Sequence, residues 1–276
     1  MKLSPFTYIN ANLSDRGITP TKLVEMVSSF AHAQGVTRVD LSDNPIAKGR
    51  ETTDEVYEAT GVEYEEDTTG VHALSTIKVK SLIMRNCELG PKAITALSST
   101  LSKVAVVDIL ANPIGEDGFK TLMELFESTP RIQSMCGVQH GTKAADLSKR
   151  GLKPIDIKII AHELSSSRSM AGVAVIDILQ NVTDDEGLKA VIGCFEANPQ
   201  IQSVCGVAAG SVQADFSKRG LKPIDIKIIA HELNSTRSAA GLEVVDIVPP
   251  ATYNTVRYVP CVALVGVEFL LRDGRE

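Results

Sequence analysis

The sequence contains no tryptophan, and only 4% of its residues are aromatic. Proteins that bind single-stranded nucleic acid stack bases on aromatic side chains, so this scarcity argues against such a site. Basic residues are not in excess either, because 28 Lys and Arg stand against 34 Asp and Glu and the formal net charge is −6. A phosphate-binding surface needs a basic stripe. We therefore expect no nucleic acid as the main ligand.

No apolar run approaches the roughly 18 residues that a membrane span requires. The longest run, residues 259–271, is shorter and contains Glu268. The N-terminal residues lack the charged and then apolar design of a signal peptide. The five cysteines are odd in number and have no paired spacing, which is typical of a reducing compartment. These features predict an intracellular, cytoplasmic protein without a membrane span.

What the sequence does contain is internal repetition. Residues 132–179 match residues 201–248 at a constant offset of 69 positions. Within that match, residues 148–164 and 217–233 are identical, and both read SKRGLKPIDIKIIAHEL. A duplicated segment that still folds must be a modular unit.

A shorter pattern recurs in segments 36–46, 79–89, 104–114 and 173–183, with apolar residues at relative positions 1, 4 and 6. Apolar residues two apart indicate a short strand with one buried face. Position 9 holds Asn44, Cys87, Asn112 and Asn181 in turn. Because the chain must turn after the strand, an inward-pointing side chain there can meet backbone amides. We predict that the asparagines form a buried ladder between neighbouring loops rather than a ligand site.

A helix is expected after each strand. Residues 116–128 and 184–196 carry apolar residues at helical spacing and begin with acidic residues, as the helix dipole favours. Pro154 and Pro223 stand where further helices begin. Strands are expected to start near Tyr8, Val36, Val79, Val104, Ile132, Val173, Ile201 and Leu242. Residues 143–152 and 213–221 can be additional full strands, with short strands at Ile132 and Ile201 before them.

The pattern L-x-x-L-x-L-x-x-N/C-x-L resembles the ribonuclease-inhibitor-like leucine-rich repeats over nearly the whole chain. The resemblance implies an α/β horseshoe solenoid, with a parallel concave sheet and convex helices, in a single domain spanning residues 1–276. Residues 1–35 are then the N-terminal cap and first repeat, and residues 249–276 are the C-terminal cap. Arg150 and Arg219 depart from the family pattern at position 9.

Acidic residues recur at position 5 of the strand pattern, which is expected to point to the open concave face. Such a row can bind a partner with a basic surface. Alternatively, these acids serve solubility and the structure of the sheet edge. The candidate partner-binding residues in this row are Asp40, Asp108, Asp146, Asp177, Asp215 and Asp246.

Residues 48–77 form an acidic insertion that lengthens one repeat. Long insertions in compact domains are often functional, so this segment is either a solvated helix and loop or an arm that contacts a partner. Its candidate contact residues are Tyr57, Glu58, Tyr64 and Glu65.

Catalytic motifs are incomplete. The His-Glu pairs at 162–163 and 231–232 resemble the first half of the zinc-protease motif H-E-x-x-H, but the fifth position is serine in both copies. His162 and His231 are expected on helix surfaces, and Cys136 and Cys205 are expected to be ordinary thiols at the concave face or its edge. The sequence also lacks a phosphate-binding loop and a G-x-S-x-G motif. We predict no enzymatic activity, no cofactor and no metal.

The sequence therefore favours a non-enzymatic scaffold or a structural subunit of a larger assembly. Its protein partner would bind through the concave face, the acidic insertion or both. The alternative is a regulator of a GTPase, since a GTPase activator is built on the same repeat, although no residue here maps onto such a role.

Overall fold

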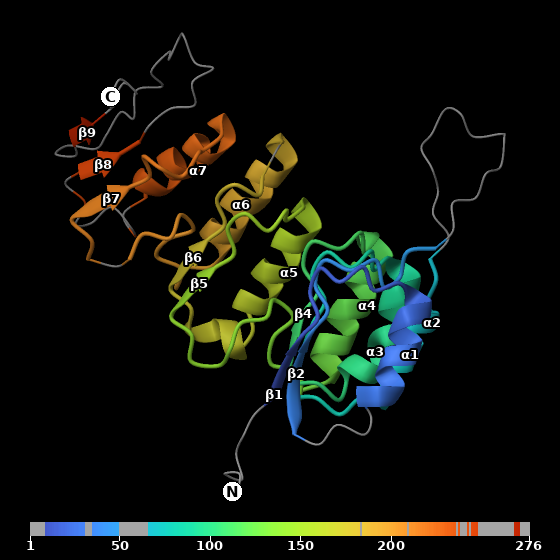
Figure 1. Ribbon diagram of the computed structural model, residues 1–276. Helices are drawn as coiled ribbons and strands as arrows, with labels where there is room; N and C mark the ends of the chain where they lie inside the picture. The colour runs from blue at the N-terminus through green and yellow to red at the C-terminus, as the bar shows by residue number, and fades with distance from the viewer. Residues whose placement is uncertain are drawn as a thin grey trace, which may run out of the picture. The chain divides into compact units, whose positions relative to one another are not determined.

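A computed structural model describes residues 9–30, 35–49, 66–182, 184–208, 210–235, 237, 242, 244–247 and 268–270. They form a mixed α/β fold in which short parallel strands alternate with helices (Figure 1). The chain divides into two compact units, residues 1–139 and 140–276, and each has its own strands and helices. Among the described helices, none is long and apolar enough to cross a membrane.

The first unit contains a four-stranded parallel sheet in the order β1-β2-β3-β4. Its helices pack in chain order, α1 on α2, α2 on α3 and α3 on α4. The elements are β1 (Ile9–Asn12), α1 (Pro20–Phe30), β2 (Val36–Asp40), α2 (Thr69–Ala73), the 3-10 helix η1 (Leu74–Thr76), β3 (Ser81–Ile83), α3 (Pro91–Leu101), β4 (Val106–Asp108) and α4 (Gly115–Ser128).

The second unit contains two sheets, β5-β6 and β7-β8-β9, whose strands are again parallel. Helix α6 packs on α5 and on α7. The elements are β5 (Ala144–Asp146), α5 (Pro154–Leu164), the 3-10 helix η2 (Ser169–Gly172), β6 (Val175–Asp177), α6 (Asp185–Ala197), β7 (Gln213–Asp215), α7 (Pro223–Leu233), β8 (Val244–Asp246) and β9 (Glu268–Leu270).

The residue patterns explain why these elements form. The middle residue of each strand from β3 to β8 is buried, as Leu82, Val107 and Ile176 are, because the alternating side chains of a strand point to opposite faces. Helices α3, α5 and α7 begin with proline, whose missing amide hydrogen costs nothing in the first turn. The helices predicted over 116–128 and 184–196 are confirmed as α4 and α6.

Six of the described strands end in the same kind of turn. The side-chain Oδ1 of the last strand residue accepts a hydrogen bond from the amide two residues later, which is an Asx turn. This contact joins Asn12 to Ser14, Asp40 to Ser42, Asp108 to Leu110, Asp146 to Ser148, Asp177 to Leu179 and Asp215 to Ser217. The acid of position 5 is therefore part of how the chain leaves the strand.

The predicted asparagine ladder is confirmed. Asn112 Oδ1 accepts hydrogen bonds from the amides of Cys87 (2.7 Å) and Leu89 (3.2 Å) in the preceding loop. Its Nδ2 donates to the carbonyls of Met84 and Ile109. Asn44 and Asn181 bond the loops before them in the same way. Each asparagine thus satisfies backbone groups of two successive loops.

Two strand predictions need correction. The segments that begin at Ile132 and Ile201 are not strands but form isolated bridges, the first to β4 through Ser134 and Cys136, the second to β6 through Ser203 and Cys205. The pieces 143–152 and 213–221 do contain full strands, β5 and β7. The serine hydroxyl explains the difference. Ser203 Oγ accepts hydrogen bonds from the amides of Cys205 and Val207, so these amides turn inward instead of continuing a ladder.

The predicted acidic insertion, residues 48–77, is only partly described. Its last part forms α2 and η1, which pack with α1 and α3 as the other helices do, so residues 69–76 belong to the helical layer. Tyr57, Glu58, Tyr64 and Glu65 lie outside the described residues. The same holds for most of the predicted C-terminal cap, of which β9 is described as a parallel neighbour of β8.

Candidate protein-binding site

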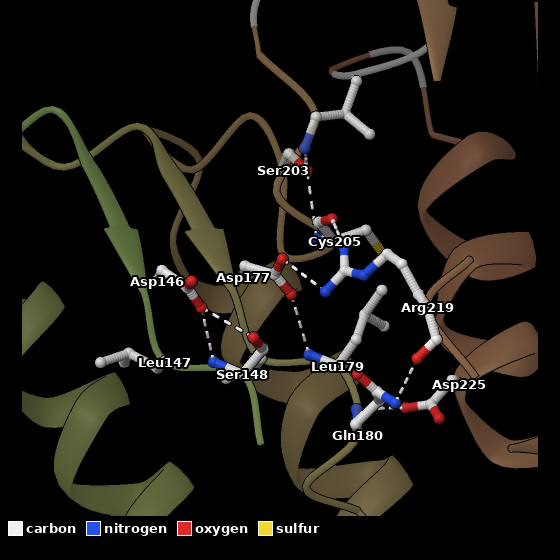
Figure 2. A network of polar contacts seen from close by, with 12 residues as sticks. Asp146, Leu147, Ser148, Asp177, Leu179, Gln180, Ser203, Cys205, Arg219 and Asp225 are labelled. Atoms are coloured by element: carbon white, nitrogen blue, oxygen red, sulfur yellow. Dashed lines mark hydrogen bonds and ion pairs between the residues drawn. The ribbon is translucent and has the colours of Figure 1, made fainter. Parts of the chain in front are cut away.

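In the second unit, two aspartates lie side by side at the ends of neighbouring strands. Asp146 ends β5, Asp177 ends β6, and the two are paired in the register of the ladder (Figure 2). Two residues earlier, Ala144 pairs with Val175 on the same face of the sheet. Ala144 and Asp146 are exposed, while Val175 and Asp177 are half-buried. We call these four residues the β5–β6 face.

Asp177 is held by an arginine from the loop after β7. Arg219 Nη2 donates to Asp177 Oδ2 at 2.6 Å, and Arg219 Nη1 donates to the carbonyl of Cys205 at 3.3 Å (Figure 2). The side chains of Arg219 and Asp177 are only 23% and 16% exposed. Since Asp177 Oδ1 also accepts the amide of Leu179, both carboxylate oxygens are engaged.

The loop that carries Arg219 is held in place by hydrogen bonds that involve Gln180. Gln180 Nε2 donates to the carbonyls of Arg219 and Gly220, and the amide of Gln180 donates to Asp225 at 2.7 Å. Asp225 is fully buried and also accepts the amide of Lys222 at the start of α7. Helix α7, the loop before it and the end of β6 are thus tied into one hydrogen-bonded network.

The two neighbouring aspartates have opposite pKa shifts. Burial raises the pKa of Asp177, and the charge of Arg219 only partly offsets it. For Asp146 burial is the largest single effect and raises the pKa, but the hydrogen bonds from Ser148 and the charges of Arg150 and Arg219 together outweigh it, so its pKa is lowered. Asp146 is therefore an ionised carboxylate on an open surface.

The first unit repeats this arrangement at the end of β4, but in a buried form. Asp108 is only 3% exposed, and Arg85 Nε lies 3.3 Å from its Oδ2. A Cβ added at Gly137 would stand 2.7 Å from Asp108 Oδ2, and one added at Gly206 would stand 2.7 Å from Asp177 Oδ2. The backbone of a Cys-Gly pair therefore lies against the carboxylate in both units.

The predicted open acid row is thus only partly open. Asp108 and Asp246 are buried, Asp40 and Asp177 are half-buried, and Asp146 and Asp215 are exposed. The prediction that position 5 points to an open face is wrong for Asp108 and Asp246, which are buried. Periodicity gives the side of the strand but not whether other residues cover it.

The thiols are also more buried than predicted. Cys136 and Cys205 are 1% and 2% exposed, so they lie in the core and not at an open face. Burial raises the pKa of the Cys205 thiol, and the nearby Glu232 raises it further. His162 and His231 lie half-exposed on their helices, in line with the sequence prediction.

Sequence reasoning missed the structural role of two residues. Glu232 is 1% exposed and accepts hydrogen bonds from the amides of Val204 (2.6 Å) and Cys205 (3.0 Å). It therefore stabilises the same loop as the Ser203 hydroxyl. Arg237 donates to the carbonyls of Phe195, Asn198 and Ile201 and stacks 3.8 Å over the Phe195 ring. The position of Glu232 in the identical segment, three and four residues after the apolar Ile229 and Ile228 on the same helix face, was the available signal for the first. Nothing in the spacing indicated the second.

Neither the protein-family models nor the curated proteins compared with this chain give a match. Among the described residues, no group of three or more His, Cys, Asp or Glu side chains is arranged to hold a metal ion. The arrangement of the β5–β6 face offers hydrogen-bond acceptors and small apolar contacts, which is chemistry suited to recognition.

Proposed function

We propose that the chain is a leucine-rich-repeat solenoid, similar to the ribonuclease-inhibitor-like type, and that it works as a non-enzymatic scaffold for a protein partner. The fold part of this proposal is supported by the alternation of parallel strands and helices and by the asparagine ladder. Repeats of this kind stack so that each satisfies the loop of its neighbour.

The β5–β6 face is the surface that we assign to the partner. The observation that carries this assignment is the exposure of Ala144 and Asp146 beside the internally paired Asp177. A parallel sheet normally has both faces covered. An open stretch with small apolar residues and a rigid, hydrogen-bonded acid is therefore suited to receive another chain.

The test is site-specific photo-crosslinking. A photoreactive amino acid replaces Ala144 in one variant and Lys189, which is exposed on α6, in the control. We expect one defined adduct from position 144 and not from position 189, and its purified partner should lose affinity when Val175 is changed to Arg. Equal labelling from both positions, or unchanged affinity of the Val175→Arg variant, contradicts the proposal.

A further inference from the structure

Arginine side chains bind the strand-end aspartates repeatedly within this protein. Arg38 Nη2 lies 3.7 Å from Asp40 Oδ2, Arg85 Nε lies 3.3 Å from Asp108 Oδ2, and Arg219 Nη2 lies 2.6 Å from Asp177 Oδ2. In each case Oδ1 is turned toward the amide two residues later. The turn therefore presents Oδ2 in a similar way each time, and a guanidinium group occupies it.

Asp146 has the same turn, but none of the described arginines lies at its second oxygen. Its Oδ1 accepts the amide (2.9 Å) and the hydroxyl (2.8 Å) of Ser148. Within the described part of the chain, no side chain donates to Asp146 Oδ2. Arg150 is close, but its Nη2 donates to the backbone carbonyl of Asp146. The carboxylate is exposed and fixed in direction.

We propose that Asp146 Oδ2 receives an arginine side chain from the partner protein, with the aliphatic part of that side chain lying over Ala144 and Val175. The proposal rests on the proposed function, since it names the residue type that the β5–β6 face selects. A guanidinium group offers fixed donors to a carboxylate, and its methylene stem packs on apolar surface.

Hydrogen-bond geometry, and not the net charge of the surface, drives this selection. The two acids Asp146 and Asp177 are accompanied by Arg150 and Arg219, both of which lower the pKa of Asp146. The local charge is therefore close to balanced, and a merely basic surface gains little by long-range attraction. A lysine-bearing segment should consequently bind more weakly than an arginine-bearing one.

The conservative variant for the test is Asp146→Asn. Asn12 shows that asparagine keeps this turn, because its Oδ1 accepts the amide of Ser14 at 3.0 Å and the Ser14 hydroxyl at 2.7 Å. The variant thus keeps the backbone and removes the negative charge. Glu186→Gln is the matched control, since Glu186 is exposed in the same unit on α6 and loses the same charge.

The probes are three fluorescein-labelled peptides of equal length built on Ser-Ala-X repeats, in which X is arginine, lysine or citrulline. Anisotropy titration of the full chain should give the tightest binding for the arginine peptide. Asp146→Asn should weaken it about five- to tenfold, to the level of the citrulline peptide, while Glu186→Gln leaves it unchanged.

Three results would overturn the inference: no binding of the arginine peptide up to millimolar concentration, equal binding of arginine and citrulline peptides, or equal effects of Asp146→Asn and Glu186→Gln. The proposed function is judged separately by the adduct at position 144. If that adduct forms and the partner ignores Asp146→Asn, the scaffold proposal stands and the arginine inference fails. If the arginine peptide binds as expected but no adduct forms at position 144, the arginine inference stands and the scaffold proposal fails.

Discussion

The ends of β4 and β6 are built from the same parts, one in each unit. Both strands end in an aspartate whose Oδ1 forms an Asx turn and whose Oδ2 meets an arginine. In both, the glycine of a Cys-Gly pair, Gly137 or Gly206, lies against the carboxylate, and a serine two residues before the cysteine turns the chain. The aspartates, serines and Cys-Gly pairs are 69 residues apart, as in the internal duplication, but the arginines are not. Arg85 reaches its aspartate from the loop before the strand, and Arg219 reaches its aspartate from a loop after the strand.

The surroundings of the two sites differ. In the first unit Ser81, Ile83, Val106 and Asp108, which lie on one face of β3 and β4, are all less than 10% exposed. In the second unit the corresponding face of β5 and β6 is open at Ala144 and Asp146. The aspartate therefore forms the turn in both settings, and it is available for binding only where its face is uncovered.

Removal of an asparagine from the ladder tests whether the two units share the same internal framework. Asn112→Ala and Asn181→Ala each leave two loop amides without their acceptor, so each should cost about 3–5 kcal/mol of unfolding free energy. Hydrogen exchange of the loops at 87–89 and 150–152 measures the effect in each unit. A much smaller loss at Asn181 would show that the second unit is held mainly by other contacts.

The Cys-Gly pairs allow a sharper comparison of the same sites. Gly206→Ala forces a side chain into a left-handed conformation (φ 79°) and against Asp177, so it should destabilise the protein by about 2–3 kcal/mol. Gly137→Ala should behave alike because of Asp108.

Gly210→Ala is the matched control. Its φ is also positive, at 75°, but no atom of the described residues lies within 4 Å of the added Cβ. The difference between Gly206→Ala and Gly210→Ala in urea denaturation therefore isolates the carboxylate contact. Equal losses would mean that backbone strain alone accounts for the glycine.

Much of this framework could be predicted from the sequence, because it depends on local patterns. Strand alternation, proline at helix starts and asparagine at position 9 act within a few residues or between adjacent loops. The strands themselves were placed two residues too early at Val79 and Val104, since the apolar position 1 of the pattern comes before the ladder begins at Ser81 and Val106.

The openness of the candidate site could not be predicted in this way. Whether Asp108 or Asp146 faces solvent depends on what lies above the strand, and that information is not in a repeating pattern. The buried Glu232 and the reach of Arg219 to Asp177 depend on contacts 27 and 42 residues apart. Such contacts are set by tertiary packing and not by periodicity.

Charge removal at the strand-end aspartates should separate structural from exposed positions. Asp108→Asn weakens a buried contact with Arg85 and should cost about 2 kcal/mol of unfolding free energy. Asp177→Asn should cost less, because that carboxylate is more exposed. Asp146→Asn should lower the midpoint of urea denaturation least of the three, because asparagine keeps the turn and only the favourable charges of Arg150 and Arg219 are lost. A loss as large as that of Asp108→Asn would mean that the Asp146 charge has a structural role comparable to that of the buried carboxylate.

The smallest expected effect concerns the pKa values of the neighbouring Asp146 and Asp177, which should be shifted in opposite directions. The pKa of Asp146 should lie below the ordinary value of 3.8, and the pKa of Asp177 should lie above it. By linkage, Asp146 contributes stability at pH values above 3.8, and this contribution is lost as the pH falls through its lower folded pKa. Asp177 acts in the opposite sense, because its ionisation costs stability as the pH rises from 3.8 through its higher folded pKa. Carbon-detected NMR titration of the two carboxyl groups would resolve the order, and a pKa of Asp177 below that of Asp146 would mean that Arg219 outweighs burial.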